Sequence, residues 1–226
     1  MTERPEPEHY FTAEPASDGE LRERTIELAG RSVPVVTAGG VFSPDGLDRG
    51  SAVLLRSVPP PPAEGTFLDL GCGWGPLALT LALTSPQATV YAVDVNRRAL
   101  DLTRRNAERL GCGVTVSNGP DSNGPHSCGP DSLGIISAEP DHVPSGQRFD
   151  LIWSNPPIRI GKQALHAMLH TWLPRLTPGG TAYLVVSKNL GADSLQEWLG
   201  TQFPHTSVRR HATSKGFRVL GVHTPS

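Results

Sequence analysis

The stretch in which a strand, a glycine-rich loop and a helix follow one another limits the choice of fold more than any other part of the chain. Residues 67–70 read as a short buried strand, 71–75 hold three glycines, and an apolar helical pattern begins at Pro76. Glycines let a backbone turn tightly and approach a ligand, and proline is tolerated in a helix's first turn. A second strand at 88–93 ends at Asp94, about 20 residues after the loop. This order predicts an α/β fold with a nucleotide-type pocket.

The glycine spacing separates two classes of ligand. Dinucleotide-binding folds space their glycines as G-x-G-x-x-G so that a helix N-terminus meets a pyrophosphate. This chain has G-x-G-x-G at 71–75, preceded by Asp69. A carboxylate at that place repels a phosphate, but it suits a ligand that carries a positive amino group and a ribose. We therefore expect S-adenosylmethionine, with Asp94 accepting hydrogen bonds from its ribose hydroxyls.

The sequence Asn155-Pro156-Pro157 directly follows another strand-like run at 149–154. Prolines fix φ and donate no backbone hydrogen bond, so they hold the Asn155 side chain and the neighbouring carbonyls outward at the strand's end. Such a cluster of acceptors suits a substrate whose NH2 group needs two partners, such as an exocyclic amine of a nucleobase or a carboxamide. The alternative interpretation is an ordinary Pro-Pro turn that closes the strand.

Three motifs together resemble the class I methyltransferases that act on an exocyclic nitrogen. They are Asp69-Leu-Gly-Cys-Gly-Trp-Gly, Ala92-Val-Asp-Val-Asn-Arg-Arg-Ala and Ser154-Asn-Pro-Pro. Four further stretches resemble the RsmC-type ribosomal RNA guanine-N2 methyltransferases: residues 41–51, Asn106-Ala107, residues 176–180 and residues 215–219. The resemblance covers roughly residues 10–222 except for one insert. It implies transfer to guanine N2 of 16S ribosomal RNA, with ribosomal RNA or the small ribosomal subunit as partner.

Two departures from that family keep other functions open. Its bacterial members usually carry a second, amino-terminal copy of the domain, so the resemblance implies a single-copy version. They usually have an aromatic residue where this chain has Ile158, which a stacked base would need. A protein glutamine N5 methyltransferase, a small-molecule N-methyltransferase and a catalytically silent cofactor-binding scaffold therefore remain alternatives.

These motifs assign roles to individual residues. The predicted catalytic residues are Asn155, Pro156 and Pro157. The predicted cofactor-binding residues are Asp69, Gly71, Cys72, Gly73, Gly75, Asp94, Val95 and Asp141. The role of Asp141, contact with the adenine amino group, is what the family resemblance implies. The predicted substrate-contacting residues are Ile158, Lys162, Lys188 and Lys215.

The alternation of strands and helices predicts a doubly wound, mainly parallel, seven-stranded methyltransferase (Rossmann-like) sheet with an antiparallel strand near the C-terminal edge. Strands are expected near 66–70, 88–93, 113–117, 149–153, 179–187, 205–210 and 217–223, and helices near 76–84, 96–110, 163–175 and 192–200. We expect a flexible acidic arm at 1–20, then a hairpin, a helix and a proline linker packed on the core at 21–62. The methyltransferase domain should span 63–226, with a flexible insert of Ser-x-Gly-Pro repeats at about 117–138.

Composition narrows the class of protein further. A chain of 226 residues suffices for one α/β domain, and its net charge of −2 argues against a general nucleic-acid coat. The charge is uneven, with +6 from Pro156 onward and −8 before it, so one end of the molecule is suited to phosphates. Three cysteines without C-x-x-C spacing indicate neither a disulfide framework nor a zinc site. With no metal, secretory signal or membrane helix expected, the sequence favours a soluble cytoplasmic protein; its oligomeric state stays open.

Overall fold

The computed structural model describes residues 20–117 and 133–226. A hairpin of two strands precedes the core, β1 (Arg22–Leu28) and β2 (Arg31–Thr37). The core strands are β3 (Glu64–Leu70), β4 (Gln87–Val93), β5 (Cys112–Ser117), β6 (Leu133–Ala138), β7 (Phe149–Ser154), β8 (Leu176–Ser187), β9 (Ser207–Ser214) and β10 (Phe217–His223). The helices are α1 (Arg49–Ser57), α2 (Pro76–Thr84), α3 (Arg97–Arg109), α4 (Lys162–Trp172) and α5 (Ala192–Gln202).

The core strands form one sheet in the order β5-β6-β4-β3-β7-β8-β10-β9. The neighbours from β5 to β8 pair in parallel, and β10 is antiparallel to both β8 and β9. Strand order reverses between β3 and β7, which leaves the switch point where such sheets bind ligands. The predicted fold class, a mainly parallel doubly wound sheet with an antiparallel strand near the C-terminal edge, is confirmed.

The number of strands differs from the prediction, because the described part of the sheet contains eight strands and not seven. The additional strand is β6, which pairs in parallel with β4 and β5. The prediction placed its residues inside the insert expected at 117–138, since the run Ile135-Ile136 is short and follows a Gly-, Pro- and Ser-rich stretch. Both isoleucines are buried in the sheet. Residues 133–138 of the expected insert are therefore a strand, and residues 118–132 lie outside the described part of the chain.

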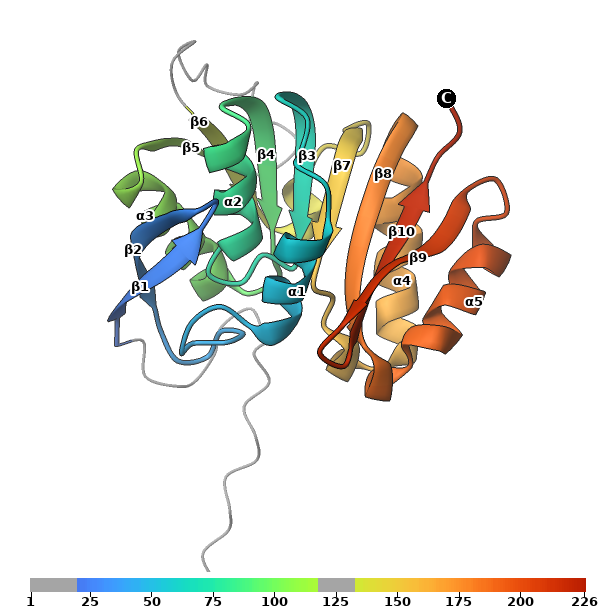
Figure 1. Cartoon of the computed structure of the whole chain (residues 1–226). Helices are drawn as coiled ribbons and strands as arrows, with labels where there is room; N and C mark the ends of the chain where they lie inside the picture. The colour runs from blue at the N-terminus through green and yellow to red at the C-terminus, as the bar shows by residue number, and fades with distance from the viewer. Residues whose placement is uncertain (1–19, 118–132) are drawn as a thin grey trace, which may run out of the picture.

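Helices cover both faces of the sheet (Figure 1). The side chains of α1, α2, α3 and the β1–β2 hairpin share one apolar core with the sheet, and those of α4 and α5 share the other. Helix α2 is buried around its whole circumference, which explains why its sequence carries no charged residue and is apolar apart from Thr80 and Thr84. Within the described residues, no helix combines the length and the apolar character needed to cross a membrane.

The amino-terminal segment is tied to the core by polar contacts as well as by apolar packing. The buried Asn106 of α3 accepts a hydrogen bond from the Val36 N–H (2.6 Å) and donates to the carbonyls of Val36 and Trp74 (both 3.0 Å). Asn96, the N-cap of α3, donates to the Gly40 carbonyl at 2.7 Å. The proposed division at residues 21–62 and 63–226 stays a prediction, and nearly all of the arm expected at 1–20 lies outside the described residues.

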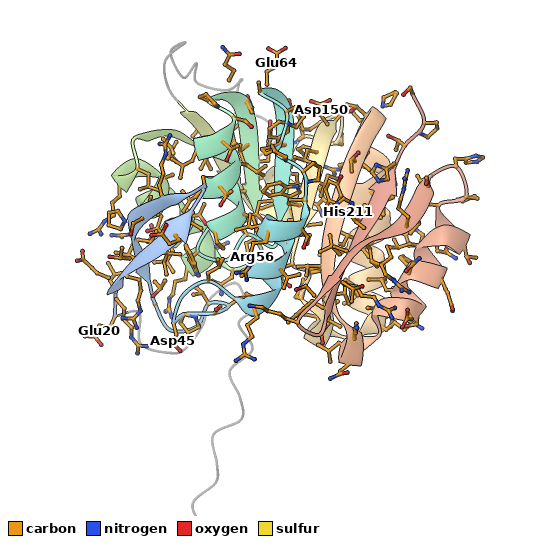
Figure 2. The ribbon with its side chains drawn as sticks, in the orientation of Figure 1. Glu20, Asp45, Arg56, Glu64, Asp150 and His211 are labelled. Carbon is orange, nitrogen blue, oxygen red and sulfur yellow. The ribbon has the colours of Figure 1, made fainter. Side chains whose placement is uncertain are left out.

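The predicted site residues lie at only one of the two edges of the sheet formed by the strand ends. The central parallel strands β3, β4 and β7 all point toward the lower edge in Figure 1. Figure 2 shows Glu64 and Asp150 at the opposite, upper edge, where Asp150 serves the fold by accepting hydrogen bonds from the Thr66 N–H (2.8 Å) and the Thr177 hydroxyl (2.9 Å). The residues predicted to act on ligands follow the carboxyl ends of these strands, as parallel sheets require.

Candidate active site

The glycine-rich loop leaves β3 and turns at once into α2. The N–H groups of Gly71 and Cys72 donate to the Val93 carbonyl at 2.8 and 3.1 Å, which holds the loop against the end of β4. Gly75, the N-cap of α2, has φ of +96°, a left-handed conformation that favours glycine. A Cβ atom there would lie 2.9 Å from the Thr103 hydroxyl. Strained backbone and close approach therefore both require glycine at this turn.

Asp69 is a fully buried carboxylate at the end of β3. Its Oδ2 accepts a hydrogen bond from the Ala78 N–H at 2.9 Å, while Oδ1 is buried with no hydrogen-bond partner among the described residues. Burial raises the pKa of Asp69 to about 8, because the charged form loses hydration. A cationic group placed beside Oδ1 would supply the missing partner and favour ionisation.

Asp94 follows β4 and faces the same loop. Its Oδ2 accepts from the Gly73 N–H and its Oδ1 from the Asn96 N–H, both at 2.9 Å. Burial raises the pKa of Asp94, although the backbone N–H groups of Asn96, Gly73 and Val95 favour its charged form. Val95, the next residue, exposes 43% of its surface. A fixed carboxylate next to an exposed apolar side chain suits a ribose with an adenine beside it.

The Asn155-Pro156-Pro157 segment begins where β7 ends. Pro157 has φ −73° and ψ 75°, and the Ile158 N–H donates to the Pro156 carbonyl at 2.8 Å, which forms an inverse γ-turn. The predicted outward carbonyl of Pro156 is thus partly engaged, with one lone pair left for another donor. The preceding Ser154 is buried and donates to the Leu70 carbonyl at 2.7 Å, which fixes the motif next to the glycine loop.

The Asn155 side chain is held by two residues of the amino-terminal segment. Its Nδ2 donates to Asp48 Oδ2 at 2.8 Å and to the Ser51 hydroxyl at 3.1 Å. Neither Asp48 nor Ser51 was among the predicted site residues. Both belong to the stretch 41–51 that carries the family resemblance, and this was the available signal.

A single cleft joins these elements. Five predicted site residues line it: Asp69, Gly71, Cys72, Gly73 and Asn155. Seven further residues line it that the sequence analysis did not assign to the site: Phe42, Ser43, Asp48, Ser51, Trp74, Pro76 and Leu77. The glycine loop and Asn155 of the Asn-Pro-Pro motif thus line the same cleft.

The other predicted residues lie around the same edge of the sheet but do not line this cleft. Asp141 is exposed in the short 3-10 turn after β6, next to the end of β4. Ile158 is half-buried and packs against the core under α4 and α5, so it is not a free stacking surface. Lys162 is exposed at the start of α4. Lys188 and Lys215 are exposed and adjacent, since the Lys188 N–H donates to the Gly216 carbonyl at 2.9 Å.

The described cysteines, and the histidine of α4 that stacks on a tryptophan, contribute to packing. Cys72 and Cys112 are free and buried, and burial raises the thiol pKa of Cys72 well above its usual value, which makes it a poor nucleophile. His166 stacks on Trp198 with ring centroids 3.6 Å apart. Across residues 20–117 and 133–226, His, Cys, Asp and Glu side chains form no cluster suited to a metal ion.

The carboxylates and the exposed apolar side chain at this edge of the sheet fit S-adenosylmethionine. The unpartnered Asp69 Oδ1 matches a positive amino group, and the Asp94 carboxylate and the exposed Val95 match a ribose and a base. A pyrophosphate would instead meet two carboxylates, one at each side of the loop. The residues present therefore fit a nucleoside with a cationic tail and do not fit a dinucleotide.

Comparisons with known proteins agree with this geometry. The family model described as "Methyltransferase small domain" matches residues 32–126 and 134–221. The uncharacterized protein YbxB of Bacillus subtilis is 32% identical over 213 residues, which cover 94% of this chain and 96% of that protein. A ribosomal RNA small subunit methyltransferase C of Klebsiella pneumoniae is 33% identical over 160 residues, 69% of this chain and 41% of that enzyme. The chain thus spans about two fifths of that relative's length.

Solved structures give the same fold. The Thermus thermophilus 16S rRNA N2 G1207 methyltransferase (RsmC), in complex with AdoMet and guanosine, matches with a TM-score of 0.71 and 22% identity over 90% of this chain and 50% of that chain. Fold and cleft together define a class I methyltransferase. The chain belongs to the methyltransferase small domain family, whose enzymes take the methyl group from S-adenosylmethionine. The predicted family, enzyme class and cofactor are confirmed.

Proposed function

We propose that this protein methylates an exocyclic amine, the N2 atom of a guanine in 16S ribosomal RNA, in the cytoplasm. The observation that carries the proposal is the presentation of Asn155 into the cleft that the glycine loop also lines. Within the described residues, both hydrogen bonds of the Asn155 side chain are made by Nδ2, to Asp48 and Ser51, and its Oδ1 makes none. An acceptor is therefore available beside the cofactor region for a substrate N–H.

The chain's residues would act by orientation. S-adenosylmethionine, when bound, supplies an electrophilic methyl group. Asn155 Oδ1 and the free lone pair of the Pro156 carbonyl accept the two N–H bonds of the amine and aim its lone pair at the methyl carbon. Asp69, the glycine loop and Asp94 would hold this cofactor, and solvent would take up the proton that the amine loses on accepting the methyl group.

This chemistry needs no strong base. Amine nitrogens on a nucleobase are weak nucleophiles because their lone pair is delocalised into the ring, and hydrogen bonds to both N–H groups localise it. In the described part of the chain, the charged side chains that line the cleft are Asp48 and Asp69. Asp48 is occupied by hydrogen bonds from Gly50, Ser51 and Asn155, and Asp69 lies beneath the glycine loop. Neither is needed to remove a proton before transfer.

Two observations support RNA as the substrate. The relative from Klebsiella pneumoniae is by name a ribosomal RNA small subunit methyltransferase, and the identity to it is 33%. The exposed Lys188 and Lys215 lie side by side at the carboxyl edge of the sheet, where phosphates beside the target base would pass. A base within stacked RNA would have to be turned out of its stack to reach the cleft.

Transfer of a tritiated methyl group tests the proposal. The protein is offered total RNA, assembled small ribosomal subunits, free 16S RNA and a protein extract in parallel, from cells that lack its gene. We expect label in 16S RNA, free or assembled, and N2-methylguanosine after digestion to nucleosides. Label confined to protein, recovered as N5-methylglutamine, would instead establish the glutamine methyltransferase. Absence of transfer to every acceptor, with cofactor binding intact, would favour the silent scaffold.

A further inference from the structure

The carboxamide of Asn155 has two orientations that differ in chemistry. A rotation of 180° about its last side-chain bond exchanges the oxygen, an acceptor, with the NH2 group, a donor. Only the orientation with the oxygen toward the cleft can accept a hydrogen bond from an amine. The proline-fixed backbone places the side chain but does not choose between the two orientations. Some other group must make that choice.

The Asp48 carboxylate can determine which orientation the Asn155 carboxamide adopts. An ionised carboxylate accepts hydrogen bonds and donates none. The 2.8 Å contact between Asp48 Oδ2 and Asn155 Nδ2 is favourable only with the NH2 group on that side, since the reverse orientation would bring two oxygens together. Ser51, at 3.1 Å, does not decide, because a hydroxyl can donate or accept.

The carboxylate is itself fixed by the start of α1. Asp48 is the N-cap of the helix, and the same Oδ2 atom accepts from the N–H groups of Gly50 (2.6 Å) and Ser51 (3.3 Å). A negative charge is favoured at a helix N-terminus, where N–H groups converge. One oxygen atom thus receives three donors, two from its own helix and one from Asn155.

Gly50 leaves the space in which this contact is made. A Cβ atom at position 50 would lie 2.8 Å from Asp48 Oδ2 and 3.2 Å from both Nδ2 and Oδ1 of Asn155. The backbone of Gly50 is helical, so conformation alone would admit alanine. Glycine is therefore required at this place for close approach of the two side chains.

Building on the proposed function, we propose that Asp48 is a positioning residue for methyl transfer: it selects the Asn155 orientation whose oxygen faces the substrate amine. Asp48 acts through Asn155 and does not touch the substrate. Its negative charge also polarises the amide toward its oxygen, which strengthens that acceptor as positive charge develops on the substrate nitrogen.

The test uses the Asp48→Ser variant. Serine is a good N-cap, so helix α1 keeps its cap, but a hydroxyl on a shorter side chain cannot enforce the amide orientation. We expect kcat to fall by about 10- to 100-fold, the range for one hydrogen bond to a charged group, with an unchanged dissociation constant for S-adenosylhomocysteine. Gly50→Ala should also lower kcat, by about 10-fold, because its Cβ atom would push the Asp48 carboxylate away from Asn155.

A double-mutant cycle separates positioning from a structural role. In the Asn155→Ala background, Asp48→Ser should change kcat by less than about 2-fold, because the amide that it orients is absent. Asp45→Ser is the matched control: Asp45 lies in the same loop, and its exposed carboxylate faces Arg22 and Arg24 of the hairpin, so this variant should keep wild-type kcat (Figure 2). An equal loss from Asp48→Ser in both backgrounds would overturn the positioning role.

A second measurement does not depend on the methyl acceptor. The side-chain NH2 signals of Asn155, assigned as those that vanish in Asn155→Ala, should be protected from solvent exchange in the wild type and unprotected in Asp48→Ser. Unchanged protection would overturn the positioning role. If Asn155→Ala itself keeps full methyl transfer, the proposed amine chemistry fails and the positioning role fails with it. If Asn155→Ala is impaired while Asp48→Ser is fully active, only the positioning role fails.

Discussion

The two halves of the cleft are built in different ways. The cofactor half consists of the loop 69–75 and Asp94, which follow neighbouring strands and hold each other by backbone hydrogen bonds. The acceptor half consists of the Asn155 motif, whose side chain is held by Asp48, a residue 107 positions away. The first half can be recognised in one short stretch of sequence, whereas the second depends on a contact that no local pattern reveals.

The two halves also treat charge differently. In the cofactor half, Asp69 is buried and its Oδ1 has no hydrogen-bond partner among the described residues. A cationic group of a ligand could therefore bind to this oxygen. The acceptor half gives the Asp48 carboxylate three donors within the protein. A group left unsatisfied is suited to binding, because the ligand completes it, while a satisfied group is suited to holding another side chain in place. Substitutions in the cofactor half should therefore change cofactor affinity, whereas substitutions in the acceptor half should change the rate of methyl transfer.

The largest effect is expected from Asn155→Ala. Removing one preorganised acceptor should lower methyl transfer by about 10²–10³-fold, while affinity for S-adenosylhomocysteine stays nearly unchanged. Asn155→Asp should also be impaired, because a second carboxylate beside Asp48 adds repulsion. Single-turnover methyl transfer at saturating cofactor, together with calorimetry, checks both. Turnover within a few-fold of wild type in the alanine variant would reduce the motif to a turn.

Asp94→Ala should produce the converse result. Loss of the carboxylate removes the ribose acceptor and leaves the N–H groups of Gly73 and Asn96 without their partner. We expect S-adenosylhomocysteine affinity to fall by about 10- to 100-fold, with a much smaller change in single-turnover rate once cofactor saturates. An equal fall of rate and affinity would mean that the two halves are not separable.

Asp69 should make stability depend on pH. In the unfolded chain its carboxyl titrates near ~4, but burial raises its pKa in the folded protein to about 8. The folded state therefore binds this proton more tightly, and the stability that the proton contributes is lost as pH rises from about 4 to about 8. Asp69→Asn removes this dependence. The stability of Asp69→Asn relative to wild type should therefore be roughly 3–4 kcal/mol higher at pH 8 than at pH 5.

Urea unfolding at both pH values measures this difference. Asp45→Asn, a change at an exposed carboxylate, should show a nearly constant difference from wild type across the same range. A constant difference for Asp69→Asn as well would show that Asp69 is ionised in the folded protein throughout.

The smallest effect is expected at the lysines beside the cleft. Lys188→Ala and Lys215→Ala should each weaken binding of small-subunit RNA by about 2- to 5-fold at low salt, since each removes one exposed phosphate contact. The losses should shrink as salt is raised, and cofactor affinity should not change. Filter binding at two salt concentrations checks this, with Lys162→Ala as a further member of the series. Losses that persist at high salt would indicate a contact other than a phosphate.

Much of the fold followed from local patterns in the sequence. Helices α2 and α3 carry clear start signals, Pro76 and Asn96, and the predicted bounds of 76–84 and 96–110 agree with the structure within about a residue. Strand β6 was missed because its short apolar run adjoins a repeat of turn-forming residues, and only pairing with β4 and β5 reveals it as a strand. Residues 133–138 form a strand because they pair with β4 and β5, and local propensity alone does not predict that pairing.

In the candidate site too, residues in local motifs were predicted, and residues brought in by tertiary packing were missed. The predicted residues Asp69, Gly71, Gly73 and Asn155 meet in one cleft because strand ends in a parallel sheet converge. The lining contributed by Phe42 and Ser51 was not predicted, because it depends on how α1 and the segment before it pack against the sheet. The roles of the individual site residues stay predictions until the variants are measured.

The span between Asp48 and Asn155 also has a consequence for the order of events during synthesis. A chain that grows at 5–20 residues per second needs roughly 5 to 20 s to add the 107 residues between them. Asp48 and its helix leave the ribosome long before the motif that they hold. The glycine loop and Asp94 emerge in between, so all residues of the cofactor half are made before Asn155. Methyl transfer would then become possible only once β7 has joined the sheet.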